Sequence, residues 1–225
     1  MHPALGRMVA IIPIIAFTLA CLACNVASAT VAIPDPLLDE SPTAAKGERV
    51  AVVAGGCFWG IQAVFEHVKG VVDVKAGYAG GSADTAHYEI VSSGRTGHAE
   101  SVRIKYDPSQ ISYGQLLKVF FSVAHNPTEL NRQGPDHGTQ YRSAIFCSNE
   151  EQQRIAKAYI DQLNQVRAFG QPIVTVVSVG NPFYEAEAYH QDYAVHHPNE
   201  PYIVINDLPK VANLRKQFPG LYVSR

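Results

Sequence analysis

The spacing of apolar positions predicts regular structure from about residue 49 onward. Residues 49–54 form a short β-branched run that ends at Gly55-Gly56, which predicts a buried strand. Apolar residues then recur at the i, i+3, i+4, i+7 spacing from Ile61 to Val68. This spacing predicts an amphipathic helix directly after the first strand.

Two more strands are predicted at 71–78 and 98–106. The second of them alternates, so Glu100 shares a strand face with Val102 and Ile104. A carboxyl on an otherwise apolar face is costly unless it is paired or protonated, although an edge-strand surface charge would explain it equally well.

Helix-start signatures mark the second half of the chain. Ser112 with Gln115 forms a capping box, and Ser148 with Glu151 forms another. The remaining elements are predicted as strands at 141–147 and 173–179 and helices at 184–194 and 210–217. This order predicts an α+β fold, a two-layer sandwich with βαβ units and an irregular C-terminal extension.

The first 29 residues differ from the rest of the chain. One charge, Arg7, precedes an apolar run from Met8 to about Ala23, and Ala27-Ser28-Ala29 follows as a small-x-small cleavage site. We interpret 1–29 as a secretory signal peptide, and the protein as exported to the periplasm or secreted. The alternatives are an uncleaved anchor and lipidation at Cys21 or Cys24, neither of which has the usual Leu three residues earlier.

A segment rich in Pro, Asp, Ser and Ala follows the leader. We predict that residues 30–47 form a flexible tether and that the folded domain spans 48–225. The hydrophobic fraction of 47% and charged fraction of 17% are those of a globular chain, and the net charge of −2 gives no reason to expect nucleic acid as a partner.

Cysteine usage narrows the chemistry. Cleavage after residue 29 would leave only Cys57 and Cys147, which form no CxxC pair and no disulfide framework. His190, His196 and His197 could in principle bind a metal, but no acidic or Cys partner has ligand spacing. We therefore expect no metal.

Cys57 is the candidate nucleophile. It lies between a predicted strand and helix, flanked by Gly56 and Gly60 and followed by Phe58 and Trp59. A helix start favours an anion, so this position is expected to lower the pKa of the thiol. The alternative is a buried structural cysteine.

Polar partners for this thiol must come from distant segments. Besides Glu100, the candidates are Asp136 in a long glycine-containing loop and the tyrosines Tyr88 and Tyr141. Taken alone, the aspartate could be ordinary turn chemistry and the tyrosines ordinary core residues.

Several separated motifs resemble one known family. They are Gly56-Cys57-Phe58-Trp59-Gly60, then 94–100 (GRTGHAE), 136–145 (DHGTQYRSAI), 184–191 (YEAEAYHQ) and 206–210 (NDLPK). In this order they resemble peptide methionine sulfoxide reductase of the A type, from about residue 49 to residue 222.

The resemblance implies a ferredoxin-like core and reduction of the S epimer of methionine sulfoxide, free or in proteins, without a metal or organic cofactor. Cys57 would attack the sulfoxide sulfur and become a sulfenic acid, while Glu100 would protonate the oxygen. Tyr88, Tyr141 and Asp136 would complete the oxygen site. Phe58 and Trp59 would form the pocket for the substrate methyl group.

One feature departs from that family. Many members carry a resolving cysteine near the C-terminus, whereas residues 218–225 contain none. We expect Cys147 to be structural and an external reductant, a thioredoxin-like protein or a small thiol, to restore Cys57. A monomer is expected. The rival functions are a Cys-based peroxidase and a non-enzymatic exported binding module.

Overall fold

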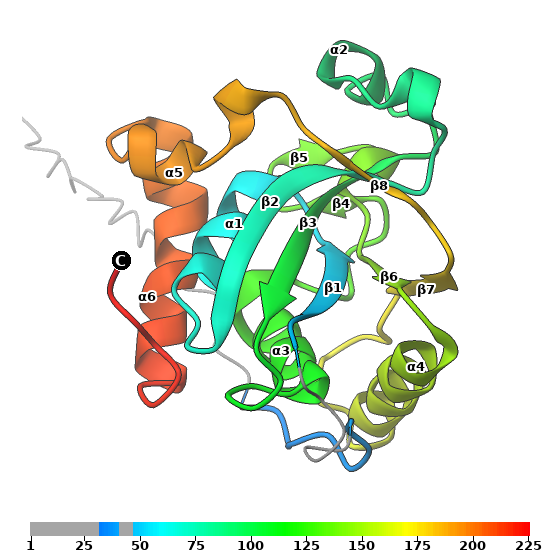
Figure 1. Ribbon diagram of the computed structural model, residues 1–225, viewed down its shortest axis with the longest axis vertical. Helices are drawn as coiled ribbons and strands as arrows, with labels where there is room; N and C mark the ends of the chain where they lie inside the picture. The colour runs from blue at the N-terminus through cyan, green and yellow to red at the C-terminus, as the bar shows by residue number, and fades with distance from the viewer. Residues whose placement is uncertain (1–31, 41–46) are drawn as a thin grey trace, which may run out of the picture.

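The strand predicted first lies inside a six-stranded sheet. The computed structural model describes residues 32–40 and 47–225, and its sheet has the order β7-β6-β1-β3-β2-β8 (Figure 1). The strands are β1 (Arg49–Ala54), β2 (Val71–Ala79), β3 (Ala99–Tyr106), β6 (Ala144–Cys147), β7 (Val176–Val179) and β8 (Phe183–Glu185). A separate two-stranded ribbon pairs β4 (Arg132–Gln133) with β5 (Asp136–His137).

The helices pack mainly on one face of this sheet. The longer ones are α1 (Phe58–Glu66), α3 (Tyr113–Val119), α4 (Glu150–Gln165) and α6 (Leu208–Gln217), and the single-turn ones are α2 (Tyr88–Val91) and α5 (Tyr193–His196). The main core combines alternate residues of β1, β2, β3 and β6 with the apolar faces of α1, α3 and α4. Figure 1 shows α6 beside α1, and α5 lies above α6 in this view.

The central topology is ferredoxin-like, as expected. Along the chain it reads β1-α1-β2-β3-α3-β6, and in space the strands lie in the order β6-β1-β3-β2 with every neighbouring pair antiparallel. β7 adds a parallel strand at one edge and β8 an antiparallel strand at the other. The α+β two-layer fold is thereby confirmed.

Three predicted elements are wrong in detail, and one of them, the strand predicted at 173–179, begins only at Val176. The strand predicted at 141–147 begins only at Ala144, because Tyr141 lies in a 3₁₀ turn. The backbone carbonyl of Tyr141 accepts from the N–H of Gly56 at 3.2 Å. The helix predicted at 184–194 is instead β8, a 3₁₀ turn and α5. Tyr184 pairs with Tyr78 at the sheet edge, and this pairing replaces the helix there.

Both helix-start signatures mark real helices. The Ser112–Gln115 capping box is present as predicted, with each residue accepting from the backbone N–H of the other. The second helix begins one residue later than predicted, because Asn149 rather than Ser148 accepts from the N–H of Gln152 at 2.9 Å.

Residues 32–40, which we call the N-terminal strap, are not a flexible tether. Ile33 is buried, and the carbonyl of Pro34 accepts from the Tyr159 hydroxyl at 2.7 Å. Residues 41–46 and the predicted signal peptide lie outside the described residues. Within the described residues, no helix is long and apolar enough to cross a bilayer.

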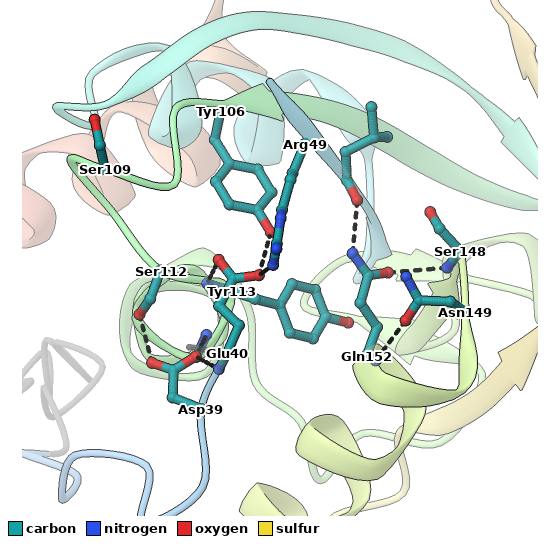
Figure 2. A network of polar contacts seen from close by, with 12 residues as sticks. Asp39, Glu40, Arg49, Tyr106, Ser109, Ser112, Tyr113, Ser148, Asn149 and Gln152 are labelled. Carbon is teal, nitrogen blue, oxygen red and sulfur yellow. Dashed lines mark hydrogen bonds and ion pairs between the residues drawn. The ribbon is translucent and has the colours of Figure 1, made fainter. Parts of the chain in front are cut away.

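The strap ends in two acidic residues that bind the start of α3 (Figure 2). Asp39 accepts from the N–H of Gly114 at 2.8 Å, and Glu40 accepts from the N–H of Tyr113 at 3.0 Å. Glu40 also forms an ion pair with Arg49 and accepts from the Tyr106 hydroxyl at 3.2 Å. The folded domain therefore includes the strap and does not begin at residue 48.

Candidate active site

Cys57 occupies the N-cap position of α1, directly after β1. Gly56 makes the turn with φ +95°, and a Cβ there would lie 2.6 Å from the Gln133 side chain. This position therefore requires glycine both for its backbone conformation and for space. The Cys57 side chain is 7% exposed.

Glu100 reaches the same helix start from β3. Its carboxylate oxygen Oε2 accepts from the backbone N–H of Phe58 at 3.2 Å, and the residue is 2% exposed. The alternating face predicted from the sequence is thus buried, and Glu100 is its polar member beside Cys57. The edge-strand alternative is wrong, because β3 lies between β1 and β2.

Burial favours the protonated forms of both Cys57 and Glu100. Burial raises the pKa of Glu100 to about 8; the Phe58 N–H opposes this rise and the charge of Asp136 adds to it. Burial also raises the pKa of the Cys57 thiol well above its usual value, and Glu100 and Asp207 raise it further. The expectation that the helix start would lower the thiol pKa is wrong, because desolvation outweighs the helix-start effect.

Tyr88 and Tyr141 lie close to this pair. Burial raises the pKa of each hydroxyl, and the charges of Glu100 and Cys57 raise it further in both cases. The Tyr88 backbone is held by Glu187, which accepts its N–H at 3.0 Å. The two tyrosines come from α2 and the turn before β6, and the fold brings them to one place.

Asp136 binds another tyrosine. Its oxygen Oδ2 accepts a short hydrogen bond from the Tyr202 hydroxyl. The carboxylate is near enough to raise the pKa of Glu100 by its charge. Asp136 therefore belongs to the site, and its direct partner is a residue that the sequence did not indicate.

The Trp59 indole is fixed on three sides. Its ring stacks on Tyr193 with centroids 3.8 Å apart and meets Tyr202 edge-on at 6.0 Å. Its N–H donates to Nδ1 of His190 at 3.3 Å. The partners all come from the irregular C-terminal segment, so this segment shapes the site.

Phe58 lies deeper than Trp59. It is 1% exposed and packs against Tyr78 at 5.9 Å and His190 at 5.1 Å between ring centroids. Phe58 thus forms an inner wall behind the partly exposed Trp59.

Sequence reasoning missed the roles of several residues around this centre. His190, first weighed as a metal ligand, instead binds the Trp59 indole, and Asp207 and Lys210 lie against the first turn of α1. The sequence pointed to these three residues only because His190 lies in the motif 184–191 and Asp207 and Lys210 lie in the motif 206–210. In residues 32–40 and 47–225, no group of three or more His, Cys, Asp or Glu side chains could hold a metal ion.

Sequence comparison identifies similar proteins. A family profile described as peptide methionine sulfoxide reductase matches residues 49–221. A peptide methionine sulfoxide reductase MsrA 2 of Mesorhizobium japonicum is 62% identical over 179 residues, covering 80% of this chain and 92% of that protein. A Synechocystis protein of the same name is 55% identical over 188 residues, covering 83% and 88%.

Structure comparison agrees with these matches. Reduced Mxr1 from Saccharomyces cerevisiae superposes with a TM-score of 0.61 and 34% identity, covering 68% of this chain and 87% of that one. Methionine sulfoxide reductase A of Corynebacterium diphtheriae gives a TM-score of 0.58 and 31% identity, covering 74% and 83%.

Proposed function

This chain belongs to the peptide methionine sulfoxide reductase family, and we propose that Cys57 and Glu100 carry out its reaction. The enzyme reduces methionine S-sulfoxide to methionine and so repairs oxidised proteins. This activity replaces the rival readings of a Cys peroxidase and a non-enzymatic binding module. The observation that carries the residue assignment is the meeting of a buried thiol and a buried carboxyl at the start of α1.

The protonation states suit the chemistry. A sulfoxide is a poor electrophile until its oxygen is protonated, and a carboxylic acid with a pKa of about 8 still holds its proton at neutral pH. Glu100 gives its proton to the sulfoxide oxygen as Cys57 Sγ bonds to the sulfoxide sulfur. The thiol proton returns to Glu100, the oxygen passes to Cys57, and methionine leaves a sulfenic acid behind.

The surrounding side chains position the substrate. The hydroxyls of Tyr88 and Tyr141 donate to the sulfoxide oxygen as charge develops on it. Trp59 presents an apolar ring to the substrate methyl group, with Phe58 as the wall behind it. Asp136 acts by holding Tyr202, which packs on the Trp59 ring.

Mass spectrometry of the reduced enzyme tests this assignment. One equivalent of methionine S-sulfoxide should add one oxygen atom to the peptide that contains Cys57, trapped by a sulfenic acid reagent such as dimedone. The R epimer should not. Cys57→Ser should abolish turnover, whereas Cys147→Ser should retain it. Turnover by the Cys57→Ser enzyme would refute the assignment.

An external thiol then restores Cys57. We assign this step to a thioredoxin-like protein or a small thiol: one thiol displaces water from the sulfenic acid, and a second thiol releases Cys57 as the free thiol. Cys147 is buried on β6, where its sulfur contacts the Tyr113 hydroxyl at 3.9 Å.

The strand register supports an external reductant. Val52 pairs with Phe146, so Cys147 lies level with Ala51. The three steps along the strand from Ala51 to Ala54 already span about 10 Å, and Cys57 lies beyond Ala54. A disulfide needs Cα atoms within about 7 Å. Stoichiometric formation of a Cys57–Cys147 disulfide after one turnover would contradict this step.

The leader supports export of the enzyme. The charged start, apolar run and Ala27-Ser28-Ala29 site favour a periplasmic or secreted protein, with a lipid anchor at Cys21 or Cys24 as the alternative, and we propose that this protein is a monomer. Intact mass and sedimentation velocity of the protein recovered from the periplasm test the leader and the monomer together.

A further inference from the structure

A buried ion pair lies against the helix turn that begins at Cys57. Asp207 ends the short π-helical turn η5 (Ile203–Asp207), and Lys210 is in the first turn of α6. Lys210 Nζ donates to Asp207 Oδ1 at 3.0 Å; the Asp207 side chain is fully buried and that of Lys210 is 18% exposed. The second oxygen, Oδ2, is buried without a partner among the described residues.

Gly60 is the point of contact between this pair and α1. A Cβ on Gly60 would lie 2.1 Å from Asp207 Oδ1 and 2.6 Å from Lys210 Nζ. Gly60 is three residues after Cys57, and Cβ positions at that helical spacing are about 5–6 Å apart. The ammonium therefore lies within roughly one helical turn of the catalytic sulfur.

The charges around Cys57 are otherwise unfavourable to a thiolate. Glu100 and Asp207 disfavour ionisation of the thiol, whereas Lys210 favours it. A thiolate must nevertheless form as Cys57 attacks the sulfoxide. A buried ion pair adds little to stability compared with apolar residues of the same volume, so stability alone does not account for this pair.

We propose that Lys210 stabilises the negative charge on Cys57 and that Asp207 is a positioning residue that holds Lys210 beside α1. This role rests on the proposed assignment of Cys57 as the nucleophile. Lys210 supplies the positive charge, while Asp207 fixes its place and limits its effect. Removing the charge of Lys210 should therefore make Cys57 harder to ionise, whereas removing the charge of Asp207 should make it easier to ionise.

Alkylation of Cys57 measured against pH tests this role. The rate constant for iodoacetamide is followed by peptide mass spectrometry, which separates Cys57 from Cys147. In Lys210→Met the midpoint should rise by about one pH unit, and the rate at neutral pH should fall about tenfold. Two control variants should leave the midpoint within a few tenths of a pH unit of the wild-type value. They are Lys210→Arg, which keeps the charge, and Lys216→Met, which removes an exposed charge from the same helix.

Asp207→Asn provides the opposite arm. Its midpoint should fall below the wild-type value, and the double variant Asp207→Asn/Lys210→Met should lie above Asp207→Asn. The other ionisable groups near Cys57 stay unchanged in every variant: Glu100, Tyr88, Tyr141, Tyr193 and Tyr202, together with Asp136, which acts on Glu100.

The outcomes separate this role from a structural one. Equal midpoints in wild type and Lys210→Met, with both proteins folded by circular dichroism, would overturn the proposal. If Lys210→Met does not fold, the comparison of Asp207→Asn with the double variant decides, and coincident midpoints overturn it. Alkylation reads the thiol directly, so the result does not depend on whether Cys57 supports turnover.

Discussion

At the scale of single residues, the site depends on burial more than on local backbone effects. The helix start at Cys57 was visible in the sequence, and so was the carboxyl of Glu100 on an apolar strand face. The direction of the thiol pKa was not, because it depends on the depth of the pocket and on charges from distant segments. The helix start can be predicted from the local sequence, whereas the burial of the thiol and the charges around it can be determined only from the folded structure.

The protonated carboxyl of Glu100 predicts an alkaline limit to activity. In the proposed mechanism turnover needs this proton, and the pKa of about 8 lies above the ordinary carboxyl range. Activity should therefore be retained at neutral pH and fall as the pH rises through about 8. The alkaline limb of kcat/KM against pH measures this.

Replacing Glu100 by Gln removes the acid but keeps the shape. Turnover should fall by about 100-fold to 10,000-fold, the usual contribution of a general acid. Glu89→Gln, on the exposed side of α2, is the matched control and should retain wild-type activity. A Glu100→Gln enzyme of wild-type rate would remove Glu100 from the mechanism.

At the scale of secondary-structure elements, helix termini carry much of the organisation. The start of α1 holds Cys57, and the start of α3 is capped twice, by its own Ser112 and by Asp39 of the strap. The capping box was predictable because its residues are three apart in sequence. The strap was not, because Asp39 and Gly114 are 75 residues apart.

The strap predicts a large stability effect from one acidic residue. Glu40→Ala leaves Arg49 without its partner and frees the N–H of Tyr113 and the hydroxyl of Tyr106. Glu40 is buried, but the Arg49 side chain is 29% exposed and can be hydrated, so the loss should cost about 1–3 kcal/mol in the free energy of unfolding. Urea unfolding measures it.

An exposed ion pair supplies the control for the strap. Glu48 pairs with Lys105 at 3.3 Å, and both side chains are largely exposed. Glu48→Ala should therefore change the free energy of unfolding by less than about 1 kcal/mol. Equal effects of Glu40→Ala and Glu48→Ala would show that the strap does not stabilise the domain.

Gly60 predicts a reversal of helix propensity. In a free helix, Gly→Ala stabilises by about 1 kcal/mol. In α1 the new Cβ would overlap Asp207, and overpacking of this kind costs about 1–3 kcal/mol. Gly60→Ala should therefore lower the melting temperature, whereas Gly170→Ala, which has no atom within 4 Å of its Cβ position, should not.

At the scale of the whole molecule, the α+β core and the helix at 210–217 were predictable, whereas the places of residues 181–207 were not. Most core elements are periodic, so local sequence predicts them, and the ferredoxin-like topology was expected from the family resemblance. Residues 181–207 form short pieces whose places are fixed by distant partners, such as Tyr193 on Trp59 and Tyr184 on Tyr78. This segment also supplies His190, which binds Trp59, and Tyr202, which binds Asp136, so the sequence did not indicate these supporting residues.

The leader predicts the compartment in which the protein is found and the first residue of the mature chain. Expressed in a Gram-negative host, the protein should be recovered from the periplasm with Thr30 as its first residue. An Ala29→Asp change at the cleavage site should leave the uncut chain in the membrane fraction. Intact mass spectrometry of both fractions measures this, and a fatty-acyl mass on Cys21 or Cys24 would favour the anchored form.

The docked strap also limits how far the enzyme could stand from a membrane. Ile33 is already packed into the domain, and it lies ten positions after Ala23, where the apolar run of the leader ends. Ten positions reach at most about 36 Å. A chain that kept its leader would therefore hold its catalytic domain within about 36 Å of the membrane and would reach only oxidised proteins close to the bilayer, whereas a cleaved chain could diffuse through the whole compartment.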